Sequence, residues 1–324
     1  METIQDTIIK KVEQYNEISL FFHELPDLDA LGACYALRRF IRDKYPEKQV
    51  EIIGLDNLDS KFGANVFFIQ KYHVPNEFVT KSIGIILDTA NVARVWSGRQ
   101  AFCKELIRID HHPKIETFAD YEWVDASFPA TCQMVAELLF KWDPKYVLPP
   151  TASYLYAGLL TDTSRFLYLS TLPSTYEVTS KLVDTDFDRQ KIHDAIYLKK
   201  LDEMMFDSYV LKHVKFDKDL GFAYTKIKKN AFDKFGVELR MSMVHVLNNV
   251  EGANIWMTLY YDNVLKRWKG SLRSRILPIN QIAEKYNGGG HKNAAGFVIE
   301  RKSQFKQVVN DVKIYLREYL KKNS

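Results

Sequence analysis

The chain has 324 residues, of which 46% are hydrophobic and 27% are charged, values that are normal for a globular protein with room for two ordinary domains. No stretch approaches the roughly 20 apolar residues of a membrane span, and the polar, acidic first residues do not resemble a secretory signal. The three cysteines are scattered, which argues against a disulfide framework and a thiolate zinc site. We therefore expect a cytoplasmic protein that does not contact a membrane.

The net charge of +4 conceals a contrast between two parts of the chain. From residue 201 onward, 22 Lys and Arg stand against 13 Asp and Glu, a balance of +9, whereas the first 200 residues carry the remaining 23 against 28, a balance of −5. Bound cations would partly neutralise an acidic half, and a basic half suits a partner that carries phosphate. Ordinary surface charge explains any single lysine equally well, so only the contrast is informative.

In the first part of the chain, short apolar runs alternate with helical patterns. The expected helices cover residues 1–17, 30–45, 130–142 and 151–160, and the expected strands cover 18–22, 50–53, 83–87 and 106–109. This alternation predicts an α/β fold with a mostly parallel sheet and helices on both faces. Ligands of such sheets bind beyond the carboxyl ends of the strands.

The second part of the chain follows a mostly helical connection over residues 175–205. The expected strands there cover 222–227, 255–261 and 268–272, and the expected helices cover 280–286 and 302–320. These elements predict a smaller C-terminal α/β domain. We therefore divide the chain into a domain over 1–190, a helical linker over 191–208 and a second domain over 209–324.

Carboxylates and imidazoles follow several of the predicted strands. They are His23, Asp27 and Asp29, then Asp88, then the triplet Asp110-His111-His112, and finally Asp162 after a helical run. Because such residues at the ends of several strands can meet at one point, we expect them to hold metal ions. Asp27 and Asp29 are two positions apart, so their carboxylates would point the same way in an extended segment.

Each of these acids also has a simpler explanation. Asp29 can cap the helix predicted from residue 30, and Asp88 and Asp162 can each cap a helix or a turn. Capping leaves His23 and Asp27 unexplained. An unpaired Asp88 at the end of so apolar a strand would also be costly to bury.

The triplet and the ligand types indicate what such a site would do. One of the two adjacent histidines can bind a metal while the other faces the substrate, and Asp110 can orient an imidazole from behind. Carboxylates and imidazoles without a thiolate argue against structural zinc and suit Mn²⁺, for which Mg²⁺ or Co²⁺ could substitute. The expected chemistry is metal-assisted hydrolysis, in particular of a phosphate ester.

A glycine-rich motif near the C-terminus is a candidate for substrate binding. Glycines let the backbone approach a ligand closely and aim amides at an anion, although such a motif can also be only a turn. Arginines near the end of an upstream strand offer a fork that fits phosphate oxygens. The candidate residues are Arg273, Arg275, Gly288, Gly289, Gly290 and His291.

Together these motifs resemble those of the DHH phosphoesterase family. The order of His-x-x-Pro-Asp-x-Asp, an isolated Asp, Asp-His-His and a later Asp is similar to the four motifs of the family, and Gly-Gly-Gly-His is similar to its DHH-associated C-terminal domain. The resemblance covers nearly the whole chain. The chain length and the stretch over 158–166 look most like the bacterial branch that degrades nanoRNA and dephosphorylates pAp. The larger RecJ exonucleases share the motifs but carry additional domains.

The resemblance implies a role for each motif residue. One Mn²⁺ would be held by His23 and Asp27, a second by Asp29, His111 and Asp162, and Asp88 would be shared. The implied catalytic residues are His112, which faces the phosphate, Asp88, and Asp110 behind the histidines. Leu25 and Ala33 depart from the common family pattern, but neither is a ligand.

The resemblance also implies an activity: two-metal hydrolysis of nanoRNA, pAp or pApA to nucleoside monophosphates. The C-terminal domain would close over the substrate about the 175–205 connection, which limits the partner to short single-stranded RNA or small nucleotides. A homodimer is implied as well, whereas binding of long nucleic acid is not expected.

Two other functions stay open at this level. An inorganic pyrophosphatase of the same superfamily is disfavoured by the Gly-Gly-Gly-His motif. A nucleotide-binding regulator without catalysis is disfavoured because every expected ligand and phosphate-facing position holds a competent residue.

Overall fold

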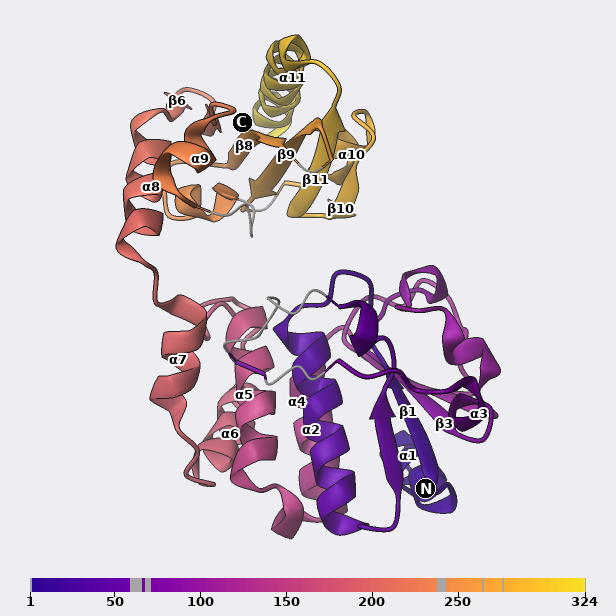
Figure 1. Cartoon of the computed structure of the whole chain (residues 1–324). Coiled ribbons are helices and arrows are strands. Elements are labelled where there is room, and N and C mark those ends of the chain that lie inside the picture. Colours follow the sequence, from indigo (N-terminus) through magenta and orange to yellow (C-terminus); the bar gives the residue numbers. More distant parts are fainter. Residues whose placement is uncertain are drawn as a thin grey trace. The chain divides into compact units, whose positions relative to one another are not determined.

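The computed structural model describes residues 2–58, 66–67, 71–237, 243–263, 265–275 and 277–323. The chain divides into two compact units, Met1–Leu198 and Lys199–Ser324, called here the N-terminal and C-terminal units (Figure 1). Each unit contains its own sheet and its own buried apolar cluster. Among the described residues, no helix is both long and apolar enough to cross a membrane.

The N-terminal unit is built on a parallel sheet, as the sequence predicts, with the described strands in the order β2-β1-β3-β4-β5. All residues of β3 are buried, as expected for the centre of a parallel sheet that is covered on both faces. The strands are β1 (Glu17–Phe21), β2 (Gln49–Ile52), β3 (Ile83–Leu87), β4 (Glu105–Asp110) and β5 (Tyr121–Val124).

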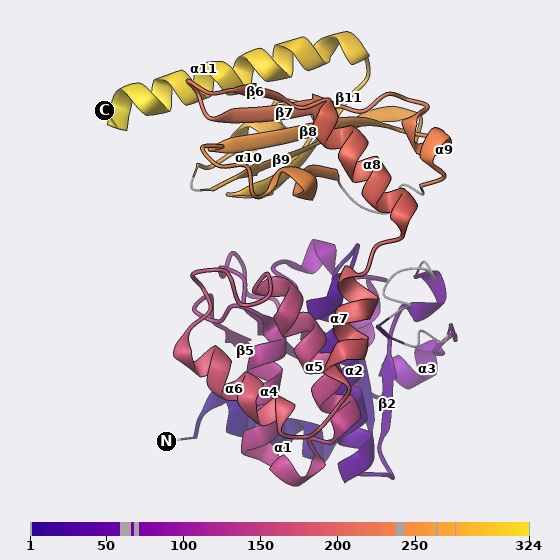
Figure 2. The ribbon, with the colours of Figure 1, turned by 90° about the vertical axis from the view of Figure 1, so that its left-hand side faces the viewer.

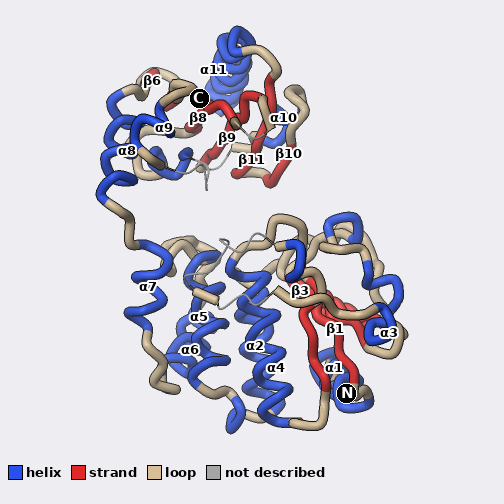
Figure 3. Tube along the Cα trace, in the orientation of Figure 1, coloured by secondary structure: helices blue, strands red, loops and turns tan. Residues whose placement is uncertain are grey.

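Helices cover both faces of this sheet, which confirms the predicted α/β class (Figures 1 and 3). Neighbouring residues of a strand point to opposite faces. Leu20 accordingly packs in the cluster that includes α2 and α4, whereas Phe21 packs with Val79 of α3. The helices are α1 (Ile4–Gln14), α2 (Leu28–Lys44), α3 (Asn76–Val79), α4 (Thr131–Trp142), α5 (Pro149–Asp162), α6 (Pro173–Val183) and α7 (Arg189–Tyr197).

The C-terminal unit is built on a mixed sheet with the described strands in the order β10-β11-β9-β8-β7-β6. Only β7 and β8 are parallel in the described part of this sheet. The long helix α11 lies along the sheet (Figure 2) and buries Val308, Val312 and Leu316, which recur at helical spacing. The elements are α8 (Leu201–Lys212), β6 (Lys215–Asp217), β7 (Phe222–Lys226), α9 (Ala231–Phe235), β8 (Ile255–Asp262), β9 (Arg267–Ser274), α10 (Asn280–Glu284), β10 (Gly289–His291), β11 (Ala294–Ile299) and α11 (Phe305–Asn323).

The sequence-based assignment missed four strands: β5, β6, β10 and β11. Three of these are only 3 or 4 residues long, too short to show a clear alternation. The glycine-rich motif is therefore an antiparallel hairpin rather than a loop, because β10 pairs with β11. A Cβ at Gly288 would lie 2.1 Å from the carbonyl oxygen of Gly296, and one at Gly290 would lie 2.4 Å from that of Ala294. Packing alone thus explains two of the three glycines.

This hairpin generates a stability prediction. Gly288→Ala and Gly290→Ala should each destabilise the C-terminal unit by about 1–3 kcal/mol, because a methyl group would collide with backbone and Gly290 also has a φ of +140°. Gly289→Ala is the matched control, since its Cβ would meet nothing within 4 Å, and should change stability by less than about 0.5 kcal/mol. Chemical denaturation of the full-length chain measures all three. Equal effects at Gly288 and Gly289 would contradict this account of the hairpin.

Candidate metal centre

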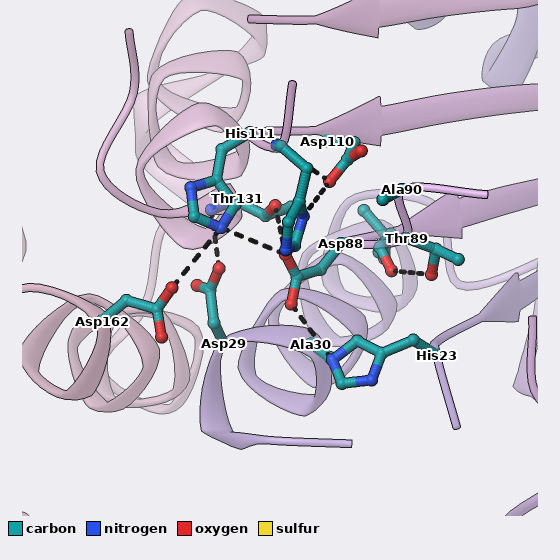
Figure 4. A network of polar contacts seen from close by, with 12 residues as sticks. His23, Asp29, Ala30, Asp88, Thr89, Ala90, Asp110, His111, Thr131 and Asp162 are labelled. Carbon is teal, nitrogen blue, oxygen red and sulfur yellow. Dashed lines mark hydrogen bonds and ion pairs between the residues drawn. The ribbon is translucent and has the colours of Figure 1, made fainter. Parts of the chain in front are cut away.

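The predicted ligands of the N-terminal unit lie together at the carboxyl edge of its sheet (Figure 4). The parallel strands β1, β3 and β4 are neighbours, so their ends bring three chain segments to one place. The start of α2 and the end of α5 supply the remaining carboxylates. The gathered residues are His23, Asp27, Asp29, Asp88, His111, His112 and Asp162.

A first group of possible ligand atoms consists of His23, Asp27 and Asp88, whose atoms lie within 4.8 Å of one another. The Nε2 atom of His23 is 3.6 Å from Oδ2 of Asp27 and 3.4 Å from Oδ2 of Asp88. The Nδ1 atom of His23 donates a hydrogen bond to the carbonyl oxygen of Glu24 at 2.8 Å. In the neutral ring, the lone pair of Nε2 therefore faces two carboxylates.

A second group consists of Asp29, His111 and Asp162. The Nε2 atom of His111 is 3.4 Å from Oδ2 of Asp162 and 3.4 Å from Oδ1 of Asp88. The Nδ1 atom of His111 donates to the carbonyl oxygen of Phe128 at 3.3 Å, so this ring repeats the arrangement of His23.

Asp88 stands between the two groups, with Oδ2 toward His23 and Oδ1 toward His111 (Figure 4). It is 1% exposed, and its backbone adopts a left-handed φ of +56° at the end of β3. That region costs a residue with a Cβ of order 1–3 kcal/mol, and such strain is often found at functional sites. The hydroxyl of Thr131 donates to Oδ1 of Asp88 at 3.1 Å.

The structure corrects two expectations about Asp27 and Asp29. Asp27, rather than Asp29, caps α2, because its Oδ1 accepts from the backbone N–H groups of Asp29 and Ala30. Asp29 lies inside the first turn of α2, so the segment is not extended and the reason for expecting both carboxylates to point the same way does not hold. The two carboxylates belong to different groups of possible ligands. The carboxylate of Asp29 accepts from the N–H groups of Thr131 at 2.7 Å and Cys132 at 2.8 Å, at the start of α4.

Burial and like charge shape the electrostatics of the site. Burial, followed by repulsion from Asp88, raises the pKa of Asp29 to about 7. Burial and neighbouring carboxylates also raise the pKa of Asp162 well above its usual range. For His23, burial lowers the pKa, but the nearby carboxylates of Asp27 and Asp88 outweigh it and raise the pKa to about 10. The site thus favours extra positive charge.

These observations test whether the residues fit metal ions. The buried carboxylates and the Nε2 lone pairs repel one another unless protons or cations lie between them. The donor set contains oxygen and nitrogen atoms and no thiolate among the described groups. Such a set fits hard divalent cations such as Mn²⁺.

In the triplet Asp110-His111-His112, a carboxylate rather than a backbone carbonyl holds the second histidine. The Nδ1 atom of His112 donates to Oδ1 of Asp110 at 2.7 Å, while Oδ2 of Asp110 accepts from Arg108 at 2.6 Å. Burial raises the pKa of Asp110, but these contacts outweigh it and lower the pKa below its usual range. His112 also lies near Asp88, with Nδ1 3.6 Å from Oδ1, so the geometry groups it with possible ligands as well.

Sequence reasoning missed two residues that hold this site, Arg108 and Thr131. Arg108 falls within the strand predicted over residues 106–109, and its position two residues before Asp110 places both side chains on one face of β4. Thr131 lies 43 residues from Asp88 in sequence, and no local pattern links the two.

The residues predicted to bind substrate belong to the C-terminal unit. Arg273 of β9 is the register partner of Ala294, which is itself the partner of His291 in β10. Arg275 donates through Nε to the carbonyl oxygen of Ala253 at 3.0 Å and through Nη2 to that of Val250 at 3.3 Å. These contacts give Arg275 a structural role, and its role in substrate binding stays a prediction.

Two family models match the chain, one to each unit. The model of the DHH family, N-terminal domain, matches residues 17–159, and the model of the DHHA1 domain matches residues 225–318. The first match includes every gathered residue except Asp162.

Several proteins are similar to this chain over nearly its whole length. A protein of Mycoplasma genitalium with the name "Uncharacterized protein MG371" is 45% identical over 93% of this chain and 92% of its own. The "Bifunctional oligoribonuclease and PAP phosphatase NrnA" of Mycoplasma pneumoniae is 30% identical and aligned over 94% of each chain.

A solved structure agrees with the fold. The crystal structure of an exopolyphosphatase-related protein from Bacteroides fragilis superposes with a TM-score of 0.83 over 97% of each chain, at 23% identity. The family models and the relatives together identify the chain as a member of the DHH family that carries a DHHA1 domain.

Proposed function

We propose that this protein is a divalent-metal-dependent hydrolase that cleaves phosphoesters in short oligoribonucleotides or small nucleotides such as pAp and pApA, releasing nucleoside monophosphates. The observation that carries the proposal is the position of Asp88, whose two oxygens face two separate histidine–carboxylate groups. Relatives named as bifunctional oligoribonuclease and PAP phosphatase support the substrate class.

Two Mn²⁺ ions are the proposed cofactors, with Mg²⁺ or Co²⁺ as substitutes. His23 and Asp27 would hold one, Asp29, His111 and Asp162 would hold the other, and Asp88 would serve both. When bound, such cations supply a water molecule of lowered pKa and positive charge for the phosphate oxygens. The N–H groups at the start of α4 hold Asp29 in place before any cation binds.

His112 is the residue of this chain proposed to act directly on the phosphate. Its Nδ1 hydrogen is committed to Asp110, so the ring is held in one orientation. Burial lowers its pKa, but the hydrogen bond to Asp110 and the charge of Asp88 outweigh this and raise the pKa, which favours the protonated ring. A cationic imidazole would stabilise the negative charge that develops on phosphate oxygens.

For the other end of the substrate, we propose the hairpin of the C-terminal unit. A Cβ at Gly289 would meet nothing within 4 Å, so a ligand could approach its backbone. His291 and Arg273 lie on the same row of the sheet, on either side of Ala294. A cytoplasmic location and a homodimer complete the proposal.

The proposal is tested by a panel of substrates with Mn²⁺: short RNAs of graded length, pAp, pApA, cyclic di-AMP and pyrophosphate, with products resolved. We expect nucleoside monophosphate from the short RNAs or from pAp and pApA. Release of phosphate from pyrophosphate alone would favour a pyrophosphatase, and no turnover on any member would favour a nucleotide-binding regulator.

Asp88→Asn tests the shared carboxylate, since Asn tolerates the left-handed backbone that Asp88 adopts. Turnover should fall by about 10³-fold or more, because metal ions supply several kcal/mol and each 1.4 kcal/mol is tenfold. The metal-free variant should still fold, because the change keeps the size of the side chain and removes both a repulsion with Asp29 and an attraction to His23. The control is Asp43→Asn near the far end of α2, which should retain activity. An Asp88→Asn variant that turns over normally would contradict the assignment.

The pKa values also predict how stability depends on pH. The metal-free protein keeps a proton on Asp29 up to about pH 7 that the unfolded chain loses near its ordinary pKa of 3.8, so this contribution falls as the pH rises through that window. The contribution of His23 is complete below its ordinary pKa of 6.5 and is lost as the pH approaches about 10. The melting temperature of the metal-free protein should therefore decline between about pH 5 and 9.

Mn²⁺ should oppose this decline, because a cation replaces the protons and binds more tightly as they leave. Differential scanning calorimetry with EDTA or with Mn²⁺ at several pH values measures both effects. Stabilisation by Mn²⁺ that does not grow with pH would count against binding at these carboxylates.

A further inference from the structure

Arg108 is the largest side chain that is fully buried in the described part of the molecule, with 0% exposure. Burying a guanidinium in the middle of a sheet is costly unless its hydrogen bonds are satisfied and its charge is balanced. Its location therefore calls for an explanation in terms of its partners.

The guanidinium binds three acceptors that belong to different segments. Nη2 donates to Oδ2 of Asp110 at 2.6 Å and to the carbonyl oxygen of Ala90 at 2.9 Å. Nη1 donates to the carbonyl oxygen of Glu116 at 3.0 Å. The guanidinium also lies 4.7 Å from the ring centroid of Phe118. One side chain thus joins β4 to the turn after β3 and to the loop after the triplet.

The two oxygens of the Asp110 carboxylate have different partners. Oδ2 is held by Arg108, and Oδ1 remains for Nδ1 of His112 at 2.7 Å. Because one oxygen is fixed, the carboxylate cannot rotate, and the imidazole it binds has one preferred orientation. The contact with Ala90 holds Arg108 itself in place, because Ala90 belongs to the turn that follows β3.

We propose that Arg108 is a positioning residue of the active site: it fixes Asp110, and through Asp110 it fixes the ring of His112 relative to Asp88. This inference rests on the proposed phosphoester hydrolysis. Arg108 touches neither a candidate ligand nor a substrate in this account, and its effect passes through the carboxylate of Asp110.

A double-mutant cycle distinguishes this role from mere filling of buried space. The variants are Arg108→Met, Asp110→Asn and the double variant, with Arg108→Lys as the conservative change. Arg108→Met should lower kcat by about 10–100-fold with KM changed less than about twofold, as for other residues that orient an active-site group. Arg108→Lys should recover only part of this loss, because an ammonium cannot reach three acceptors in the geometry of the fork. In the Asp110→Asn background, Arg108→Met should have little further effect.

A second readout does not depend on activity. In thermal unfolding of the metal-free protein, Arg108→Met should lower the melting temperature more than the double variant does, because the single change leaves the buried carboxylate of Asp110 with its contacts to His112 but without its arginine. The control is Arg42→Met, an arginine near the far end of α2 that also donates to a carbonyl oxygen and a carboxylate, and it should keep kcat unchanged.

Different results would overturn the role of Arg108 and the proposed function. The inference is overturned if both Arg108 variants keep kcat within about twofold, or if the losses from Arg108→Met and Asp110→Asn multiply in the double variant. If Arg108→Met does not fold, Arg108→Lys and the double variant decide by the same criteria. Absence of turnover by the parent protein on every substrate would instead be a failure of the proposed function, and the unfolding cycle would still test the Arg108–Asp110 pair.

Discussion

Repulsion among buried carboxylates and imidazole lone pairs is the constraint on which the N-terminal unit depends. Asp29 and Asp88 are almost completely buried within reach of Asp162 and two Nε2 atoms. The fold offsets part of this repulsion with fixed donors, namely the N–H groups at the start of α4 for Asp29 and the hydroxyl of Thr131 for Asp88. These donors do not compensate all of the repulsion, and the rest can be relieved only by protons or divalent cations. The repulsion that destabilises the metal-free protein therefore also provides the affinity for metal.

The scaffold explains why these groups meet. The neighbouring parallel strands β1, β3 and β4 end at the same edge of the sheet. A polar ligand residue follows the carboxyl end of each strand. Around this edge the fold supports the ligands from behind. Backbone carbonyls orient His23 and His111, whereas His112 is oriented by Asp110, which is in turn held by Arg108. The histidines that are held by backbone carbonyls are the two proposed to bind metal. The histidine that is held by a carboxylate is the one proposed to face the phosphate.

Much of this could be predicted from sequence, because the information was local or followed from topology. The apolar runs before His23, Asp88 and Asp110 predict strands, and a parallel sheet brings their ends together. The rest depends on partners distant in sequence. Whether Asp27 or Asp29 caps α2 depends on where the helix begins, and the partner of Asp29 is a helix about 100 residues away. The burial of Arg108 was equally hidden, since a charged residue in a strand is usually placed at the surface. At Gly288 and Gly290, the composition signals a special backbone but does not say whether a ligand or a neighbouring strand requires it.

The most direct test of this account is to count the metal ions bound by the purified chain. Mn²⁺ retained after equilibrium dialysis, measured by elemental analysis and by electron paramagnetic resonance, should reach two ions per chain with magnetic coupling between them, because Asp88 faces both groups. In the Asp88→Asn variant the coupling should disappear and the number of tightly bound ions should fall. A parent chain that binds no Mn²⁺, or one whose binding is unchanged by Asp88→Asn, would contradict the central claim.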